Sequence, residues 1–245
     1  MSTNNQKNPL PAPRESGSSS GLYRLLAWLS PGFPVGSFAF SHGLEAAAAS
    51  GAVHDRHSLQ IWISAIVASG GGRIDADILR DAHRASSAGD IGALTDANRR
   101  GVAFRATTET RLETTAQGEA FLATCCAAWP NPVLDCWAER ISERGEAVCY
   151  AAAIGAATAQ AGIALDCALL GYLQALASNL VSAGLRLGVI GQTDGQRILA
   201  VLEPVIAAAV SGALTRDRTS FGSSTFAVEL ASMAHETQYT RLFRS

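Results

Sequence analysis

Apolar residues recur at helical spacing along most of this chain, and that spacing constrains its fold more than any other feature of the sequence. We find no stretch in which apolar and polar residues alternate as they do in a half-buried strand. The clearest helical stripes are Leu59, Trp62, Ile63, Ile66 and Val67, and Leu165, Leu169, Leu173, Leu176 and Leu180. The pattern predicts an all-α protein, a single globular domain of about eight to ten helices in a bundle-like array.

The two ends of the 245-residue chain differ from its middle. Residues 1–20 are rich in Ser, Asn, Gly and Pro and lack the apolar run of a signal peptide, so we expect a disordered leader in a cytoplasmic protein. Residues 21–245 are expected to form the domain. The last residues, about 236–245, combine aromatic and arginine side chains that are typical of interfaces. This tail therefore either docks on a partner or folds back on its own core.

The segment 165–187 is the one stretch long enough to raise the question of a membrane span. Polar and charged residues interrupt it throughout, namely Asp166, Gln174, Ser178, Asn179, Ser182 and Arg186. A span does not tolerate so many, so the segment is predicted to be a central core helix.

Capping residues predict where several helices begin. Asp55 is expected to cap the helix that carries the first apolar stripe. Ser37 or Ser41 is expected to cap a helix that starts near Leu44. Further on, Thr193 and Gln196 have the spacing of a capping box ahead of a helix.

Two charged stretches carry expectations about burial. The charges of residues 73–86 are spaced for i,i+3 and i,i+4 pairing, which favours a solvated helix face over an acidic metal site. Residues 104–128 predict one long helix with Arg111 on its apolar stripe. Arg111 is therefore either paired inside the fold or directed into a groove.

Composition excludes several classes of function. The net charge is -2 and only 16% of residues are charged, so no basic face indicates nucleic acid or an anionic membrane as partner. Lys7 is the only lysine, which excludes a phosphate-loop lysine, a Schiff base and a lysine general base in the folded part. Five cysteines show no zinc-site spacing, so reduced and mostly buried thiols are expected.

No local constellation of residues supports catalysis. His54 and His57 lie three residues apart, as metal ligands on a helix can, but their neighbours favour a turn. Ser41 and His42 lack the Gly-x-Ser-x-Gly frame of a nucleophile elbow. The sequence thus favours a binding or assembly protein, without a cofactor of its own, over an enzyme. An independent helical enzyme that uses His42, or Asp75 and Asp77, is the weaker alternative.

The segment Ser30–Glu45 alternates prolines and glycines with apolar residues. It lacks the lysine and the glycine spacing of a phosphate loop. Its glycines and prolines are expected to shape a fixed turn that seats Phe33, Phe38 and Phe40 and offers a surface to partners.

Three segments of the chain resemble a known family. Ser30–Glu45 closely resembles the opening motif of the UreF urease accessory proteins, and Arg186–Leu199 resembles their central segment. Ala231–Ser245 resembles their C-terminal signature, and Glu109-Thr-Arg111 fits their middle helix. One departure is the run Gly188-Val-Ile190, where the family commonly carries a proline.

The resemblance implies an all-helical, non-catalytic protein that is homodimeric in its working complex. Family members join UreD (also called UreH) and the GTPase UreG to deliver nickel to apo-urease, and the nickel and GTP belong chiefly to the GTPase. The C-terminal segment would contact UreD, and the central segment with its surrounding groove would contact UreG. The candidate partner-binding residues are Ser37, Ser41, Glu45, Arg111, Arg186, Gln192, Asp194, His235, Tyr239, Arg241, Leu242, Phe243 and Arg244.

A regulatory role is a second hypothesis. Arg186 or Arg111 could act on the GTPase as an arginine finger, and the simpler interpretation is a structural arginine. An interaction protein that regulates a GTPase unrelated to urease is a further alternative.

Overall fold

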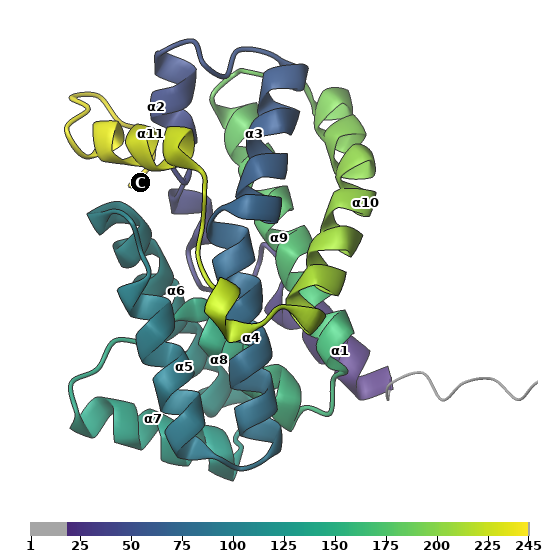
Figure 1. The fold of residues 1–245 in the computed structure, drawn as a ribbon, viewed down its shortest axis with the longest axis vertical. Helices are drawn as coiled ribbons and strands as arrows, with labels where there is room; N and C mark the ends of the chain where they lie inside the picture. Colours follow the sequence, from purple (N-terminus) through teal and green to yellow (C-terminus); the bar gives the residue numbers. More distant parts are fainter. Residues whose placement is uncertain (1–18, 245) are drawn as a thin grey trace, which may run out of the picture.

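The computed structural model describes residues 19–244 and confirms the all-α prediction, since this part of the chain contains helices and no strand (Figure 1). Most of the expected leader, residues 1–18, lies outside the described residues, while Ser19 and Ser20 already belong to the first helix. The α-helices are α1 (Ser19–Trp28), α2 (Leu44–Ala49), α3 (Arg56–Ser69), α4 (Gly71–Ser87), α5 (Ile91–Ala103), α6 (Thr108–Ala128), α7 (Pro132–Glu143), α8 (Tyr150–Gln160), α9 (Leu165–Arg186), α10 (Gln192–Thr215) and α11 (Phe226–Glu236). Two short 3-10 helices are η1 (Ser37–Ala39) and η2 (Arg218–Ser220).

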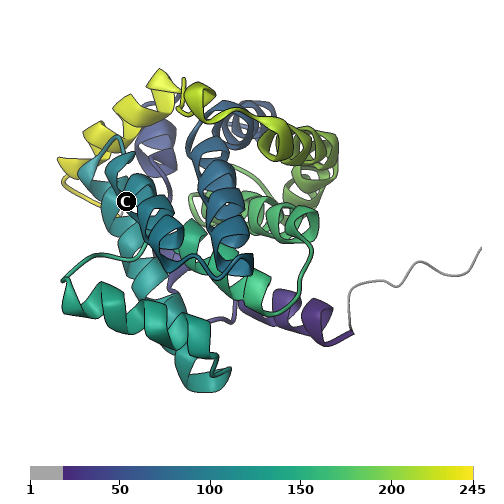
Figure 2. The same ribbon diagram turned by 60° about the horizontal axis from the view of Figure 1, so that its bottom comes forward.

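Helix α4 lies at the centre of the bundle and contacts α3, α5, α8, α9 and α10 (Figure 1). Its closest partner is the alanine-rich α8, whose residues 151–158 are buried. A Cβ atom at Gly155 would lie only 2.5 Å from the carbonyl oxygen of Leu79, so glycine permits this approach of the two backbones. Helices α9 and α10 pack side by side away from α5 and α7 (Figure 2).

The charged face of α4 is buried, so the expectation of a solvated face for residues 73–86 is wrong. Asp77 and Arg80 are 1% and 2% exposed. Asp77 accepts a hydrogen bond from Arg216 Nη1 at 2.6 Å, and Arg80 donates from Nε to Asp81 at 2.9 Å. Arg100 also pairs with Asp81. These arginine partners come from α5 and from the end of α10, which cover the charges and neutralise them.

The single helix expected over 104–128 is divided. Helix α5 ends at Ala103 and α6 begins at Thr108, because Thr107 caps α6 and forms a capping box with Thr110. The buried face of α6 therefore differs from the apolar stripe expected to include Arg111. Arg111 is exposed, so it does not lie on the buried face of α6.

Other capping predictions have mixed outcomes. Asp55 caps α3 and forms a capping box with Ser58, as expected. Helix α10 begins at Gln192 after an N-cap glycine, so the Thr193 capping box is wrong. Helix α2 also has a glycine, Gly43, as its N-cap, so neither Ser37 nor Ser41 occupies that position, although Ser41 Oγ accepts from the N–H of Glu45 in the first turn.

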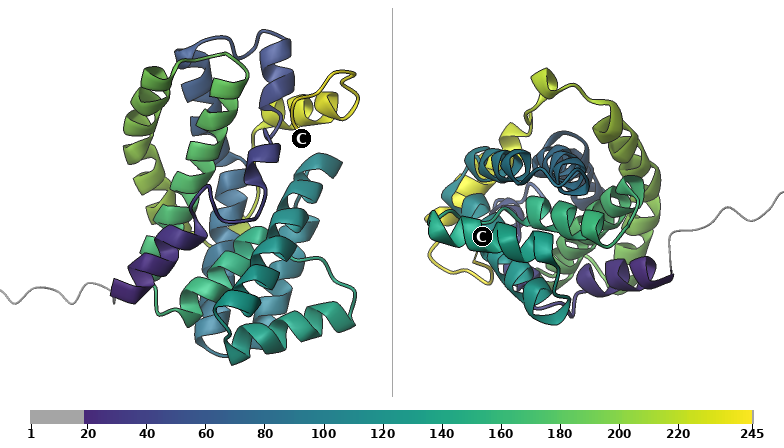
Figure 3. Two further views of the ribbon diagram at one scale, coloured as in Figure 1. Left: turned by 180° about the vertical axis from the view of Figure 1, so that it is seen from behind. Right: turned by 90° about the horizontal axis from the view of Figure 1, so that it is seen from below.

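The segment Ser30–Glu45 forms a packed turn, with one exception to the expectation. Phe33 and Phe40 are buried, but Phe38 is 67% exposed on η1. Behind the bundle, this segment runs between α1 and α2 and passes along α9 (Figure 3).

Two of the described helices, α9 and α10, are long and apolar enough to cross a membrane by length and composition alone. Half of the most apolar window of α9 and a third of that of α10 are buried inside the fold. Helix α9 contributes Leu169, Leu173 and Leu180 to the core, in line with the prediction of a core helix. All five cysteines are free. Cys125 and Cys149 are buried, Cys126 is partly buried, and Cys136 and Cys167 are exposed, so the expectation of mostly buried thiols is wrong.

Candidate functional site

The carboxylate of Glu45 receives the C-terminal tail of the chain. Glu45 lies in the first turn of α2 and is 7% exposed. The backbone N–H groups of Leu242 and Phe243 donate to its two oxygens at 2.7 and 2.9 Å. A residue at the end of the first family-like motif thus holds the last residues of the third.

His235 connects this carboxylate to a second one. It lies near the end of α11 and is fully buried. Its Nε2 is 3.0 Å from Glu45, and its Nδ1 is 2.9 Å from both carboxylate oxygens of Glu109 on α6. Arg241 of the tail also donates to Glu109, at 3.3 Å. We call Glu45, Glu109, His235 and Arg241 the tail cluster.

The tail cluster stabilises the ionised form of Glu45. Burial by itself disfavours the carboxylate, but the N–H of Leu242, the His235 ring and the N–H of Phe243 outweigh it and lower the pKa of Glu45. Glu45 is therefore a charged anchor for the tail at neutral pH.

Phe243 fixes the end of the tail by packing. Its side chain is buried, and the guanidinium carbon of Arg186 lies 4.2 Å from the centre of its ring. The backbone N–H of Arg244 donates to the carbonyl of Ala39 at 2.7 Å. The tail thus folds back on its own chain, through residues of the opening motif and of α9.

The docked tail presents several side chains outward. Tyr239 is fully exposed and Leu242 is 61% exposed. The outer side of the neighbouring α11 adds Phe226, Leu230 and Met233, which follow one another at i, i+4 and i+7. An apolar surface of this kind is typical of a protein-binding site.

A shallow pocket of about 400 Å³ joins all three family-like segments. It is lined by Glu45 and its neighbours on α2, by Leu187–Val189 after α9, and by Gln238 of the tail. Segments far apart in the sequence therefore form one continuous surface.

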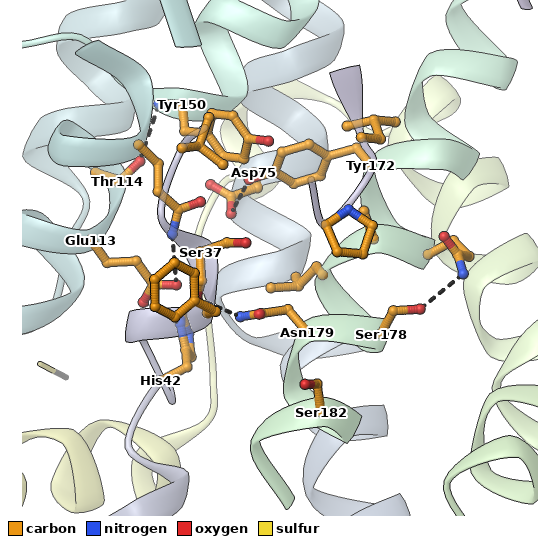
Figure 4. A pocket seen from close by; sticks show the side chains of 18 of the residues that line it. Ser37, His42, Asp75, Glu113, Thr114, Tyr150, Tyr172, Ser178, Asn179 and Ser182 are labelled. Atoms are coloured by element: carbon orange, nitrogen blue, oxygen red, sulfur yellow. Dashed lines mark hydrogen bonds and ion pairs between the residues drawn. The ribbon is translucent and has the colours of Figure 1, made fainter. Parts of the chain in front are cut away.

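A second cavity, of about 340 Å³, lies between the opening segment and helices α4, α6, α8 and α9 (Figure 4). His42 and Glu113 meet at one end of it, with His42 Nδ1 3.2 Å from the carboxylate. Asp75 lies deeper, where it pairs with Arg105 and accepts a hydrogen bond from Tyr172 at 2.9 Å. The charged groups of this cavity are therefore matched in pairs.

His42 has a left-handed backbone conformation, with φ of 56°, that is uncommon for a residue other than glycine. Its ring packs against Gly71, where a Cβ atom would lie 2.8 Å from Nε2. Burial by itself lowers the pKa of His42, but the hydrogen bond and the charge of Glu113 outweigh it and raise the pKa.

Comparison with known proteins agrees with the resemblance seen in the sequence. The UreF family model matches residues 53–203, which is more than half of the chain. A urease accessory protein UreF from Bradyrhizobium sp. (strain BTAi1) is 48% identical over 91% of this chain and 92% of its own length. Another, from Rhodopseudomonas palustris (strain BisB5), is 45% identical over 96% of this chain and 95% of its own length.

The chain belongs to the UreF family of urease accessory proteins.

The UreF-like segments place many of the candidate residues together. Glu45, His235, Arg241, Leu242 and Phe243 meet in or beside the tail cluster, and Arg186 and Arg244 flank it. Tyr239 extends from the same tail into solvent.

The remaining candidate residues do not take part in the hydrogen bonds of the tail cluster. Ser41 is buried, and its Oγ accepts from the N–H of Glu45. The backbone carbonyl of Ser37 accepts from Asn179 beside the second cavity. Gln192 and Asp194 begin α10, where Asp194 pairs with Arg197, and Arg111 is exposed on α6.

Neither Glu109 nor Glu113 is singled out from the sequence as a partner-binding candidate, although Glu109 belongs to the tail cluster and Glu113 lines the second cavity. Both lie on α6, and their partners His235 and His42 are distant in sequence. One signal was available, because Glu109 stands in the stretch that resembles the family's middle helix. Glu113 carries no such signal. Within residues 19–244, no group of three or more His, Cys, Asp or Glu side chains is arranged to hold a metal ion.

Proposed function

We propose that this protein assembles with UreD and the GTPase UreG, as a homodimer in the cytoplasm, to insert nickel into apo-urease. Its membership of the UreF family supports an accessory role in urease maturation. The observation that carries the proposal is the meeting of the first and third family-like segments at the tail cluster, and of all three around the shallow pocket. In this account the protein is a non-catalytic scaffold that carries neither the nickel nor the GTP.

The docked tail is the proposed contact for UreD. Its exposed Tyr239 and Leu242, together with the apolar side of α11, offer aromatic and aliphatic anchors on the same tail as the exposed Arg241 and Arg244. The tail cluster holds these side chains in one arrangement, so less ordering is needed when the partner binds.

The surface formed by Leu187–Val189 and the start of α10 is the proposed contact for UreG. The shallow pocket lies between this surface and the tail, so both partners could bind at once. Gln192 and Asp194 lie in the first turn of α10 and supply polar contacts to this surface.

The geometry favours a structural role for Arg186 over that of an arginine finger. Its guanidinium already stacks on Phe243, and burial lowers its pKa. Arg111 is exposed, so it is the better candidate for contact with the GTPase. GTP hydrolysis by UreG in the assembled complex should be compared for Arg111→Ala and Arg186→Ala. Unchanged hydrolysis with both variants would remove the arginine-finger hypothesis.

The accessory role is tested in cells. A strain that lacks this protein, given ample nickel, should contain urease protein with little activity, and the full chain should restore the activity. Normal urease activity in the deletion strain would overturn the proposal.

A further inference from the structure

We propose that His235 is a proton-controlled latch, which holds the C-terminal tail on the body of the protein when the ring carries two protons and releases it when one is lost. This inference rests on the proposed function, because the tail that the latch controls is the proposed contact for UreD. It adds the regulation of that site by pH.

Both ring nitrogens of His235 face carboxylate oxygens. Nε2 lies 3.0 Å from Glu45, and Nδ1 lies 2.9 Å from Glu109. A carboxylate can only accept hydrogen bonds, so each nitrogen must carry a proton to make its bond. Only the imidazolium form has protons on both nitrogens. With both carboxyl groups ionised, the hydrogen bonds of the tail cluster can all form only if His235 is charged.

The charges around the ring support the same form. Two carboxylates, Glu45 and Glu109, face two cationic groups, His235⁺ and Arg241. Loss of the histidine proton leaves Arg241 to neutralise two buried carboxylates. The neutral ring also directs the lone pair of one nitrogen at a carboxylate oxygen. This contact between two acceptors is unfavourable in a buried site.

The tail depends on both carboxylates. Glu45 accepts the N–H groups of Leu242 and Phe243, and Glu109 accepts from the guanidinium of Arg241. When His235 becomes neutral, Glu45 and Glu109 lose the group that holds them together. Either carboxylate is then better stabilised by water than by its buried position. When it turns toward water, the tail loses its anchors.

The groups around His235 come from every element that packs on it. Helix α2 contributes Glu45, α6 contributes Glu109, and the tail contributes Arg241. On α11 itself, Glu236 accepts from the N–H of Thr108. His42 and Glu113 form a separate pair beside the second cavity, and the loop that carries His42 also packs on α11 at Gly43 and Ser232. His42 must therefore be controlled for in any test.

The sign of the effect follows from these charges. The docked tail is stable where the His235 ring carries both protons, and it loses its anchors when rising pH removes one of them.

The test follows the Phe243 ring by nuclear magnetic resonance in the full-length protein. The chain has eight phenylalanines, and ring-labelled phenylalanine gives signals that do not exchange with water. The Phe243 signal is assigned by its absence in Phe243→Leu. Between about pH 5.5 and about pH 9, this signal should move from a shifted position, set by stacking on Arg186, to that of a free phenylalanine.

Three variants make the test specific. In His235→Gln the Phe243 signal should no longer depend on pH over this range, because an amide does not titrate. His42→Asn keeps a residue that tolerates the left-handed backbone, and should retain the pH response. His54→Gln, at an exposed turn, should also retain it. A Phe243 signal that stays shifted to high pH, or an equal response in His235→Gln, would overturn the latch.

Binding of purified UreD separates this inference from the proposed function. The wild-type affinity should fall about tenfold or more across the same pH range, while that of His235→Gln stays constant. If the Phe243 signal titrates but UreD binds equally at every pH, the latch stands and the tail is not the UreD contact. If UreD affinity changes without any change at Phe243, the latch is wrong.

Discussion

The guanidinium of Arg186 lies over the ring of Phe243, with 4.2 Å between the guanidinium carbon and the ring centre. Arg186 ends α9, and Phe243 is two residues from the end of the chain. This contact joins the central and C-terminal segments that resemble the UreF family. It also explains why an aromatic and arginine-rich end of the chain is ordered on the body of the protein.

Phe243→Ala should release the tail while the helices stay folded. Burial of the ring contributes about 1.5–3 kcal/mol, which is more than the remaining anchors of a short tail can replace. We expect the N–H groups of Leu242 and Phe243 to lose protection from hydrogen exchange. Tyr239→Ala is the matched control, because this aromatic residue of the same tail is fully exposed. Equal protection in both variants would contradict the role given to Phe243.

Glu45→Gln should destabilise the docked tail and reduce the protein's sensitivity to acid. The pKa of Glu45 is lowered from 4.5, so its contribution is present above that value and is lost as pH falls through the folded pKa. We expect a loss of about 2–3 kcal/mol near neutral pH, measured by denaturant unfolding. Glu203→Gln, at an exposed position on α10, should leave the free energy of unfolding unchanged. An acid profile of Glu45→Gln identical to that of the wild type would count against this anchor.

His42→Asn should remove a pH-dependent part of the stability. The pKa of His42 is raised above 6.5 in the folded protein by Glu113, so its contribution is present below 6.5 and is lost as pH rises through the folded pKa. Unfolding of wild type and variant should therefore differ most under mildly acidic conditions. His54→Asn should keep the wild-type profile, since this histidine is exposed. A constant difference at every pH would point to backbone strain instead of the ion pair.

Asp77→Asn should be among the most damaging single changes on α4. It removes the carboxylate that faces the buried Arg80 and Arg216, and the expected loss is about 3–5 kcal/mol. Asp96→Asn removes an exposed i,i+3 pair with Arg99 and should cost less than about 1 kcal/mol. Similar losses for the two variants would show that the α4 network contributes little.

The fold could be largely predicted from the sequence where the signals are local. The cap at Asp55 and the helix α3 that carries the stripe from Leu59 to Val67 follow from capping and periodicity within a few residues. The predictions fail where contacts between segments distant in the sequence determine the structure. The spacing of charges on α4 is the same on a solvated face and a buried one, and only the arrival of Arg100 and Arg216 determines which it is.

The candidate site shows the same division. The family-like motifs identified Glu45, His235 and the tail, because the residues of each motif are adjacent in sequence. The pairing of Glu45 with His235 spans 190 positions, and no pattern within either segment predicts it. The second cavity was missed, since Asp75, Glu113 and Tyr172 come from three helices that converge only in the folded chain.

Binding of purified UreD to a tail variant tests the central claim most directly. The double variant Tyr239→Ala and Leu242→Ala alters exposed side chains and should keep the fold, while Leu170→Ala with Val201→Ala alters two exposed apolar residues elsewhere. We expect the tail variant to bind UreD at least about tenfold more weakly than the wild type, and the control variant to bind normally. Wild-type affinity in the tail variant would contradict the proposal that the docked tail is the UreD contact.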